Sequence, residues 1–458
     1  MASSSILSAL SSSGLGTGQG IDVASTVATL IANLRGPEQV WQTQQQMLQV
    51  QSSALSQLNS EVSALSNAVN NLSDTSGTIN AHTVTSSQPG LVTASVTNTT
   101  PTGTHTVVVN SLATTASYYS DPVASSSTAI ATGTFTIQVG TGAATTITVD
   151  NTNNTLDGLA AAINNLNIGV SASVINDANG ARLTLVSNAP GAANDLTVTN
   201  EAGGLNFNKG SSGANASLTV DGVPISSASN VVTGVVAGLT LNLVGADPNT
   251  QVQVGVTPDS TTIAKAVTDF VDAYNAVIQD LNSQFTFNTT TNSAGPLASD
   301  AAARMVHSQL LSAMTYNGTS TSGLNTLAAM GVSMNNDGTL TVDNAALSNA
   351  ISSNYAGVQS FFHNSAGTGF ADTLQAQLNS LTDPTQGAFY VDINGLNSQQ
   401  QSFQDQIDNF EVYIASEKTM LTAQYTQVDL ALRQLPLLQQ EINSELSGIT
   451  STSSSSSK

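Results

Sequence analysis

Cysteine is absent from this chain of 458 residues, and charged residues make up only 8% of it. Without cysteine, disulfides, thiolate metal sites and thiol catalysis are excluded. Lys and Arg number only 8 against 29 Asp and Glu, so the formal net charge is −21. Nucleic acids and anionic lipid surfaces bind proteins through basic residues, so we expect no binding to either.

Long hydrophobic runs are also missing. No window of 18 apolar residues occurs, so we expect no transmembrane helix and no membrane insertion. Residues 1–20 are rich in Ser and Gly, with neither a basic start nor a compact apolar block, and predict no secretory signal peptide. The protein is therefore expected to be cytoplasmic, or exported by a route that reads an unfolded polar N-terminus.

Each end of the chain carries a ladder of apolar residues at alternating steps of three and four. One ladder runs from Val27 to Leu72 and the other from Phe403 to Ile449. Such a repeat places a narrow apolar seam along one side of a helix, and this seam needs a partner helix. We therefore predict that the two terminal helices pair antiparallel as a stalk, with everything between them inserted at its far end.

A proline interrupts each ladder. Pro37 follows Gly36, and we expect it to break the first helix and to begin a new one. If Leu72 faces residue 401, Pro37 faces Pro436, so both helices would break at the same height. Gly36, Pro37 and Pro436 are therefore predicted hinge residues, and the exposed polar seam positions Gln44 and Gln51 are predicted to fix the register, as buried amides do in coiled coils.

The middle of the chain has the alternation of β-strands. Residues 81–257 are rich in Thr, Val, Ser, Asn and Gly. We expect strands over 104–109, 134–139, 145–149, 170–175, 181–187, 195–199, 217–220 and 239–243. A short helix over 155–164, with Thr155 as N-cap, would pack on a small antiparallel sheet.

Helical periodicity returns from Thr262. Helices are expected over about 262–281, 298–314, 343–361 and 368–381, and from Leu396 to the C-terminal Ser-rich tail. A hairpin turn is predicted at Asn335-Asn336-Asp337-Gly338.

The fold class predicted from these patterns is α+β multidomain, an antiparallel coiled-coil or helical-bundle stalk with inserted, mostly antiparallel β heads. Residues 1–36 and 437–458 would form a flexible terminal foot, and 37–80 with 258–436 the helical stalk domain. Residues 81–130 with 215–257 would form one head, and 131–214 an inserted second head with one short helix.

No pattern in the sequence predicts catalysis. The histidines, His82, His105, His307 and His363, are isolated in the sequence, and neither a nucleophile elbow nor a phosphate-binding loop occurs. Asp300, Asp337 and Asp343 stand where helix caps and turns are expected. We therefore expect no enzyme activity, no metal site and no cofactor.

Several blocks resemble one family, the flagellar hook-associated protein 2 or filament cap family. At the N-terminus these are Gly14-Leu15-Gly16-Thr17-Gly18 with Ile21-Asp22-Val23, and Leu30-Ile31 with Pro37; the family's usual acidic residue before the Pro is replaced by Leu34-Arg35-Gly36. The segment from Thr134 to Asp195 is similar to the insertion motif of flagellin and hook proteins. The C-terminal half adds Phe270–Asn275, Gly295–Asp300, Met330–Asp343 and Val358–Phe362 in matching order.

The resemblance implies a secreted protein of the bacterial flagellum that caps the distal filament tip, exported by the flagellar type III route. It implies a ring of about four to six subunits that retains exported flagellin and promotes its polymerisation. Implied partners are flagellin, the hook–filament junction proteins and a type III export chaperone.

The ladders and the resemblance together define candidate assembly residues. The predicted seam consists of Trp41, Leu48, Leu55, Leu58, Val62, Leu65, Val69, Phe403, Ile407, Phe410, Ile414, Leu421, Val428 and Leu432. The predicted filament contacts are Leu15, Val27, Leu30, Leu34, Ile442 and Leu446.

Two alternatives remain open. The Thr-rich heads are compatible with a surface adhesin that binds host glycans or mucin, with or without capping. Another flagellar axial subunit, such as flagellin or a hook-junction protein, would share the terminal seams and the insertion motif. It would leave the blocks Phe270–Asn275 and Met330–Asp343 unexplained.

Overall fold

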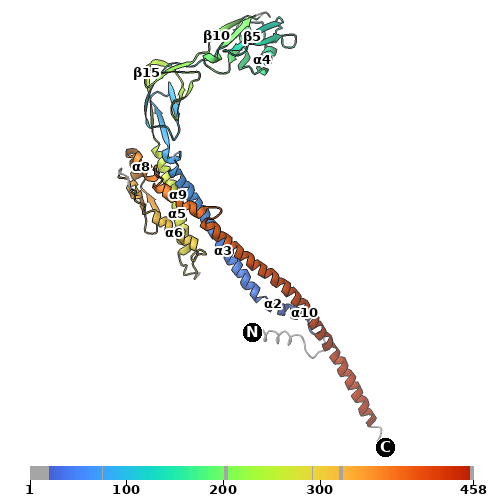
Figure 1. Cartoon of the computed structure of the whole chain (residues 1–458). Helices are drawn as coiled ribbons and strands as arrows, with labels where there is room; N and C mark the ends of the chain where they lie inside the picture. The colour runs from blue at the N-terminus through green and yellow to red at the C-terminus, as the bar shows by residue number, and fades with distance from the viewer. Residues whose placement is uncertain (1–19, 75, 201–204, 291, 319–322, 454–458) are drawn as a thin grey trace.

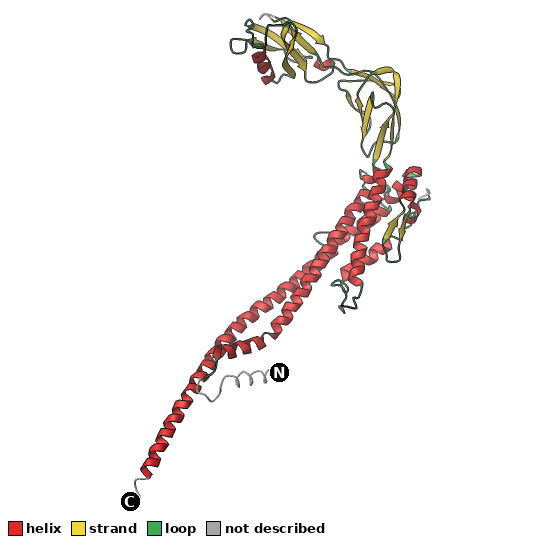
Figure 2. Cartoon of the chain, turned by 180° about the vertical axis from the view of Figure 1, so that it is seen from behind, coloured by secondary structure: helices red, strands yellow, loops and turns green. Residues whose placement is uncertain are grey.

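The computed structural model describes the chain except for residues 1–19, 75, 201–204, 291, 319–322 and 454–458. It is long and thin: a helical stalk carries two β heads at one end, and α2 and the end of α10 lie toward the other end (Figure 1). Coloured by secondary structure, helix is concentrated in the stalk and strand in the heads (Figure 2). This arrangement confirms the predicted fold class.

The stalk is built on four helices. They are α3 (Gly36–Ser73), α5 (Ser260–Phe285), α9 (Phe370–Thr382) and α10 (Ala388–Ser453). Of these, α10 pairs with the lower part of α3 while α5 and α9 cover its upper part. A shorter helix, α2 (Val23–Leu34), precedes α3 and lies on the lower part of α10. The upper seam residues Leu55, Leu58, Val62, Leu65 and Val69 are fully buried in the core shared with α5 and α9.

Smaller elements lie beside the upper stalk. They are α6 (Ala301–Ala313), the short helix η3 (Leu327–Met330), the hairpin β16 (Val332–Met334) and β17 (Leu340–Val342), α7 (Asn344–Ser353) and α8 (Tyr355–Phe362). The predicted hairpin turn is confirmed, with Gly338 at φ 84°. The single helix expected over 343–361 is wrong, because Asn354 interrupts it at φ −148° and caps α8 through the N–H of Gly357.

The first head contains two antiparallel sheets around one core. The five-stranded sheet has the order β1 (His82–Ser86), β15 (Asp247–Pro258), β3 (Gly103–Ser111), β11 (Ala216–Val220) and β12 (Val223–Ser227). The three-stranded sheet has the order β13 (Val231–Val236), β14 (Leu239–Leu243) and β2 (Val92–Val96). The turn η1 (Thr78–Asn80) links this head to α3.

The second head has its own core of two sheets and one helix. One sheet has the order β10 (Phe207–Ser211), β4 (Ser117–Ser120), β8 (Gly180–Ser187) and β7 (Val170–Asp177). The other sheet has the order β6 (Thr145–Val149), β5 (Gly133–Val139) and β9 (Leu196–Asn200). The helix α4 (Leu156–Asn165) shares this core and packs on β7 and β8. Thr155 caps α4 as predicted, accepting from the N–H of Gly158.

The predicted boundary between the heads at residue 131 is wrong. β4 pairs with both β8 and β10, and Ala116 and Ile130 are buried in the second core. The segment 116–130 therefore belongs to the second head. Its polar, turn-rich sequence contains only one short strand, which depends on pairing with residues far away in the chain.

Within the described ranges, no helix has the length and apolar character needed to cross a membrane.

Candidate assembly interface

The N-terminal helix α2 docks on α10 through a small apolar cluster. Asp22 caps α2 by accepting from the N–H of Ser25 at 3.1 Å. Val27, Ile31 and Ile414 form the buried centre of the contact, 2%, 8% and 2% exposed. The residues partly buried around them are Val23, Phe410, Leu421 and Tyr425. The amphipathic pattern of α2 is thus satisfied within the chain.

The start of α2 is anchored by a carboxylate. The Ile21 N–H donates to Asp429 Oδ1 at 2.8 Å, and Arg433 Nε donates to Asp429 Oδ2 at 2.9 Å. Gly20 has a φ of 73°, and a Cβ there would lie 2.1 Å from Asp429 Oδ1. The backbone approaches α10 so closely that only glycine fits at this position.

A charged cluster holds the joint between α2 and α3. The Arg35 guanidinium bridges Glu411 of α10 and Glu38 of α3, with Nη2 donating to Glu411 Oε2 at 2.9 Å. This hydrogen bonding holds the pKa of Glu411 below its usual range and raises that of Arg35. Glu38 is 6% exposed and also accepts from Gln42, so its charge is buried but paired. In a chain with so few cations, this arrangement fixes the joint.

Below the main core, α3 and α10 pair through one aromatic contact and a series of polar ones. Trp41 meets Phe410 edge-on, and Gln45 donates to Gln404 at 2.9 Å. Ser52 and Asn397 are 3.4 Å apart. The ladder is therefore a seam with two kinds of partner, α10 below and the α5–α9 core above.

The predicted register of this seam is wrong. It would place Trp41 opposite Leu432, whereas the structure places it against Phe410, a shift of 22 residues (432 to 410). That shift is close to three heptads, and a slide by whole heptads leaves the same side of each helix facing the partner. The ladder thus indicates the face of each helix correctly but carries almost no information on its register.

The predicted break at Pro436 is also wrong, because α10 continues through this residue to Ser453. The carbonyl that a proline leaves without a partner can be hydrated here, since residues 434–447 are exposed throughout. Pro436 does not face Pro37: α2 contacts α10 before Pro436, between Phe410 and Arg433.

The predicted site residues separate into three groups. Leu48, Phe403, Ile407, Phe410, Ile414 and Leu421 are buried or half-buried in stalk contacts. Val27, predicted to contact the filament, is instead buried against α10, and Val428 of the predicted seam is exposed. Of the other predicted filament contacts, Ile442 and Leu446 are exposed at 57% and 59%, Leu34 is just exposed and Leu30 is half-buried. Leu15 lies outside the described residues, and the predicted seam residue Leu432 is half-buried.

The polar residues that hold this region were missed or misassigned. Gln44, predicted as an exposed seam position that fixes the register, is exposed, but its neighbour Gln45 makes the contact with α10. Gln51 does act across helices, donating to Asp300 at 3.3 Å. Arg35, Glu411 and Asp429 were not predicted, although each is a rare charged residue on or beside a ladder, a signal that could have marked them.

No chemical centre accompanies this interface in the described part of the chain, where no three His, Asp or Glu side chains gather as a metal site. Two histidines are less isolated than their sequence positions indicated. His105 Nδ1 lies 2.7 Å from Asp221 in the first head, and His363 Nδ1 lies 2.7 Å from Asp372 in the stalk domain. Each is a simple pair that joins two elements of one domain.

Comparison with known proteins identifies the chain. The profile of the flagellar hook-associated protein 2 N-terminus matches residues 19–116, and that of its C-terminus matches residues 213–436. The B-type flagellar hook-associated protein 2 of Pseudomonas aeruginosa is 29% identical over 401 residues, covering 81% of this chain and 82% of that protein. The flagellar hook-associated protein 2 of Aeromonas caviae is 27% identical over 355 residues, covering 72% and 75%.

The fold agrees with these sequence matches. The crystal structure of the flagellar cap protein FliD D1-D2-D3 domains from Escherichia coli superposes with a TM-score of 0.61 at 29% identity. It covers 75% of this chain and 99% of that chain. The two profiles match the parts of the chain before and after the second head, which together form the stalk and the first head. On these matches, this chain belongs to the flagellar hook-associated protein 2 family.

Proposed function

We propose that this chain caps the distal tip of the bacterial flagellar filament as a secreted structural protein, retaining exported flagellin and promoting its ordered polymerisation. The observation that carries the proposal is family membership combined with a long helical stalk that holds two β heads far from α2 and from the end of α10. Heads at one end can form a plate, while the other end reaches the filament. The role needs no catalysis.

We infer a closed ring of about four to six copies, since identical subunits most often assemble with closed rotational symmetry. Its partners would be flagellin, the hook–filament junction proteins and, before export, a type III chaperone. The symmetry of such a ring need not match that of a helical filament end. Contacts between the lower end of each stalk and the filament that are individually weak and reversible would therefore be useful.

The exposed end of α10 is well suited to such contacts. Beyond Arg433 it is a single helix that carries a row of exposed apolar side chains. These side chains are Leu435, Leu437, Leu438, Ile442 and Leu446, each more than half exposed. We propose that they bind the filament, and that the exposed helix around Pro436 bends to accommodate uneven steps of the filament end.

Truncation of residues 437–458 tests this assignment. Without the exposed helix, purified protein should still form rings in electron micrographs, whereas filaments should fail to grow on cells. Removal of only residues 454–458 serves as the control and should leave filament length normal. Normal filaments on cells that carry the longer truncation would contradict the model.

Deletion of the whole chain separates capping from adhesion. Loss of filaments with flagellin released into the medium is expected for a cap. Normal filaments combined with lost adhesion would instead support the adhesin reading.

A further inference from the structure

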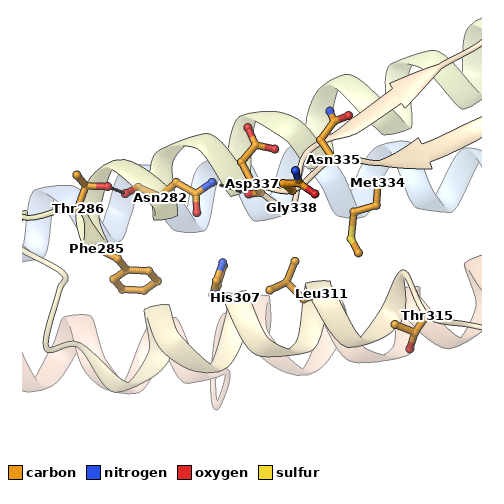
Figure 3. Close-up of a pocket in the computed structure, with 11 residues that line it drawn as sticks. Asn282, Phe285, Thr286, His307, Leu311, Thr315, Met334, Asn335, Asp337 and Gly338 are labelled. Carbon is orange, nitrogen blue, oxygen red and sulfur yellow. Dashed lines mark hydrogen bonds between the residues drawn. The ribbon is translucent and has the colours of Figure 1, made fainter.

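A groove lies beside the upper stalk, away from the terminal helices. It runs between α6, the end of α5 and the β16–β17 hairpin (Figure 3). Two hollows of about 770 and 260 Å³ adjoin here and share Thr315 and Met334 in their walls. Their combined size is in the range of sites that bind several side chains of a ligand or peptide.

Apolar and aromatic side chains line the interior of this groove beside polar ones, which include Asp337. Phe285, His307, Leu311 and Met334 point into it from opposite walls (Figure 3). The rings of Phe285 and His307 meet edge-on at 5.5 Å, and burial lowers the pKa of His307, which keeps the imidazole neutral at neutral pH. The Asp337 carboxylate is engaged by the hydroxyl and N–H of its own turn residue Thr339.

One wall of the groove is an open strand edge. On the far side of the hairpin, the side chain of Asn275 bonds both the N–H and the carbonyl of Leu340, at 2.6 and 2.8 Å, and so closes the edge of β17. Leu340 and Met334 form a non-hydrogen-bonded antiparallel pair, because the backbone groups of Leu340 bind Asn275 instead. In such a pair the N–H and the carbonyl of both residues point away from the partner strand. Met334 therefore directs its N–H and carbonyl outward, and among the described residues no hydrogen bond engages them.

An extended chain would satisfy this edge and fill the groove at once. Strand addition supplies backbone hydrogen bonds, while alternate side chains enter the apolar hollow. Met334, 51% exposed, offers a flexible surface that adapts to different side chains. A short helix would fill the hollow as well but would leave the strand edge unpaired.

The charge of the groove wall indicates which kind of chain could supply the bound segment. Among the described residues the groove wall carries the acidic Asp337 and no Lys or Arg, whereas Arg304 on α6 is turned to the carbonyls of Ser299 and Asp300. A second copy is a poor partner, because its net charge is −21 and most of its few cations are in ion pairs. A segment with apolar residues and a flanking Lys or Arg complements the groove better.

We propose that this groove binds an extended apolar segment, flanked by a basic residue, of an axial subunit arriving at the cap, by adding a strand to β16. The proposal rests on the proposed capping function, since export delivers such subunits in an unfolded form. The groove would hold the segment transiently, before the subunit folds into the filament.

A defined peptide tests the binding on the full-length protein. The probe is a fluorescent octapeptide with alternating Val or Leu and Thr and with Lys at each end. Its control carries the same side chains but N-methyl groups on alternate amides, so that it cannot add a strand. We expect saturable binding of the first peptide, about tenfold weaker binding of the second, and slowed hydrogen exchange at 332–334. Equal binding of the two peptides, or protection elsewhere only, would overturn the proposal.

Substitutions then locate the site. Met334→Gln should weaken binding of the peptide about tenfold, because it places an amide in the apolar wall. Met305→Gln is the matched control, since Met305 is similarly exposed at 45% on α6 but does not line the groove. Thermal unfolding of both variants would show that they fold.

The result is separable from the capping role. If Met334→Gln leaves peptide affinity unchanged but alters ring assembly, the occupant is a second copy and the proposal fails. If deletion of the chain leaves filaments normal, the capping function fails, whatever the peptide does.

Discussion

The indole of Trp41 stands edge-on against the ring of Phe410, with ring centroids 5.5 Å apart and ring planes at 89°. This contact lies just above the small cluster that docks α2, and it joins the two terminal helices at one register. Because the chain contains no cysteine, the register can be tested with engineered disulfides free of background thiols.

The pair Gln45→Cys and Gln404→Cys should form a disulfide on mild oxidation, since these side chains touch across the seam. The matched control is Gln45→Cys with Val428→Cys, the partner that the heptad ladder alone would give. Gel mobility under non-reducing conditions distinguishes the looped monomer. Efficient closure of the control pair, or failure of the first pair, would refute the observed register.

Trp41→Ala should destabilise the lower stalk by about 2–3 kcal/mol, because the half-buried indole loses both packing area and the edge-on contact. Val40→Ala is the control, since Val40 is 57% exposed on the neighbouring position and should change stability by less than about 0.5 kcal/mol. Urea unfolding followed by circular dichroism measures both. Faster hydrogen exchange in α2 is expected for Trp41→Ala only.

Acid should loosen the joint between α2 and α10. Arg35 holds the pKa of Glu411 below its ordinary value of 4.5, so the unfolded chain takes up this proton first as the pH falls. The pair therefore contributes its full stabilisation above pH 4.5 and loses it as the pH falls through the lower, folded-state pKa.

Glu411→Gln should remove this part of the acid dependence, whereas Glu441→Gln, on the exposed end of α10, should retain it. The observable is hydrogen exchange of α2 between neutral pH and about pH 3. An unchanged acid response in Glu411→Gln would mean that another group governs the joint.

Tyr274→Phe should be neutral or stabilising by up to about 1–2 kcal/mol. Tyr274 is fully buried, and its hydroxyl oxygen has no hydrogen-bond partner among the described residues. Tyr316→Phe is the opposite case, because the Tyr316 hydroxyl donates to the Thr368 carbonyl at 2.6 Å. Its loss should cost about 1 kcal/mol in thermal or urea unfolding. A clear destabilisation by Tyr274→Phe would reveal a buried partner, such as a water.

Much of the local structure was predictable because its causes are local. Capping residues such as Asp22 and Thr155, the turn at Gly338 and the apolar periods of α3, α5 and α10 act over a few neighbouring residues. These features, with the family motifs, were sufficient to predict a two-headed helical stalk and its family. The faces of the terminal helices were likewise determined by the ladders.

Only the tertiary structure decided which elements meet. A heptad ladder is nearly unchanged by a slide of whole heptads, so the pairing of Trp41 with Phe410 depends on the α5–α9 core that covers the upper part of α3. Strand β4 joins the second head through pairing with residues far along the chain. The bridge from Arg35 to Glu411 and the open edge of β16 arise in the same way, from contacts between distant segments that no short sequence pattern specifies.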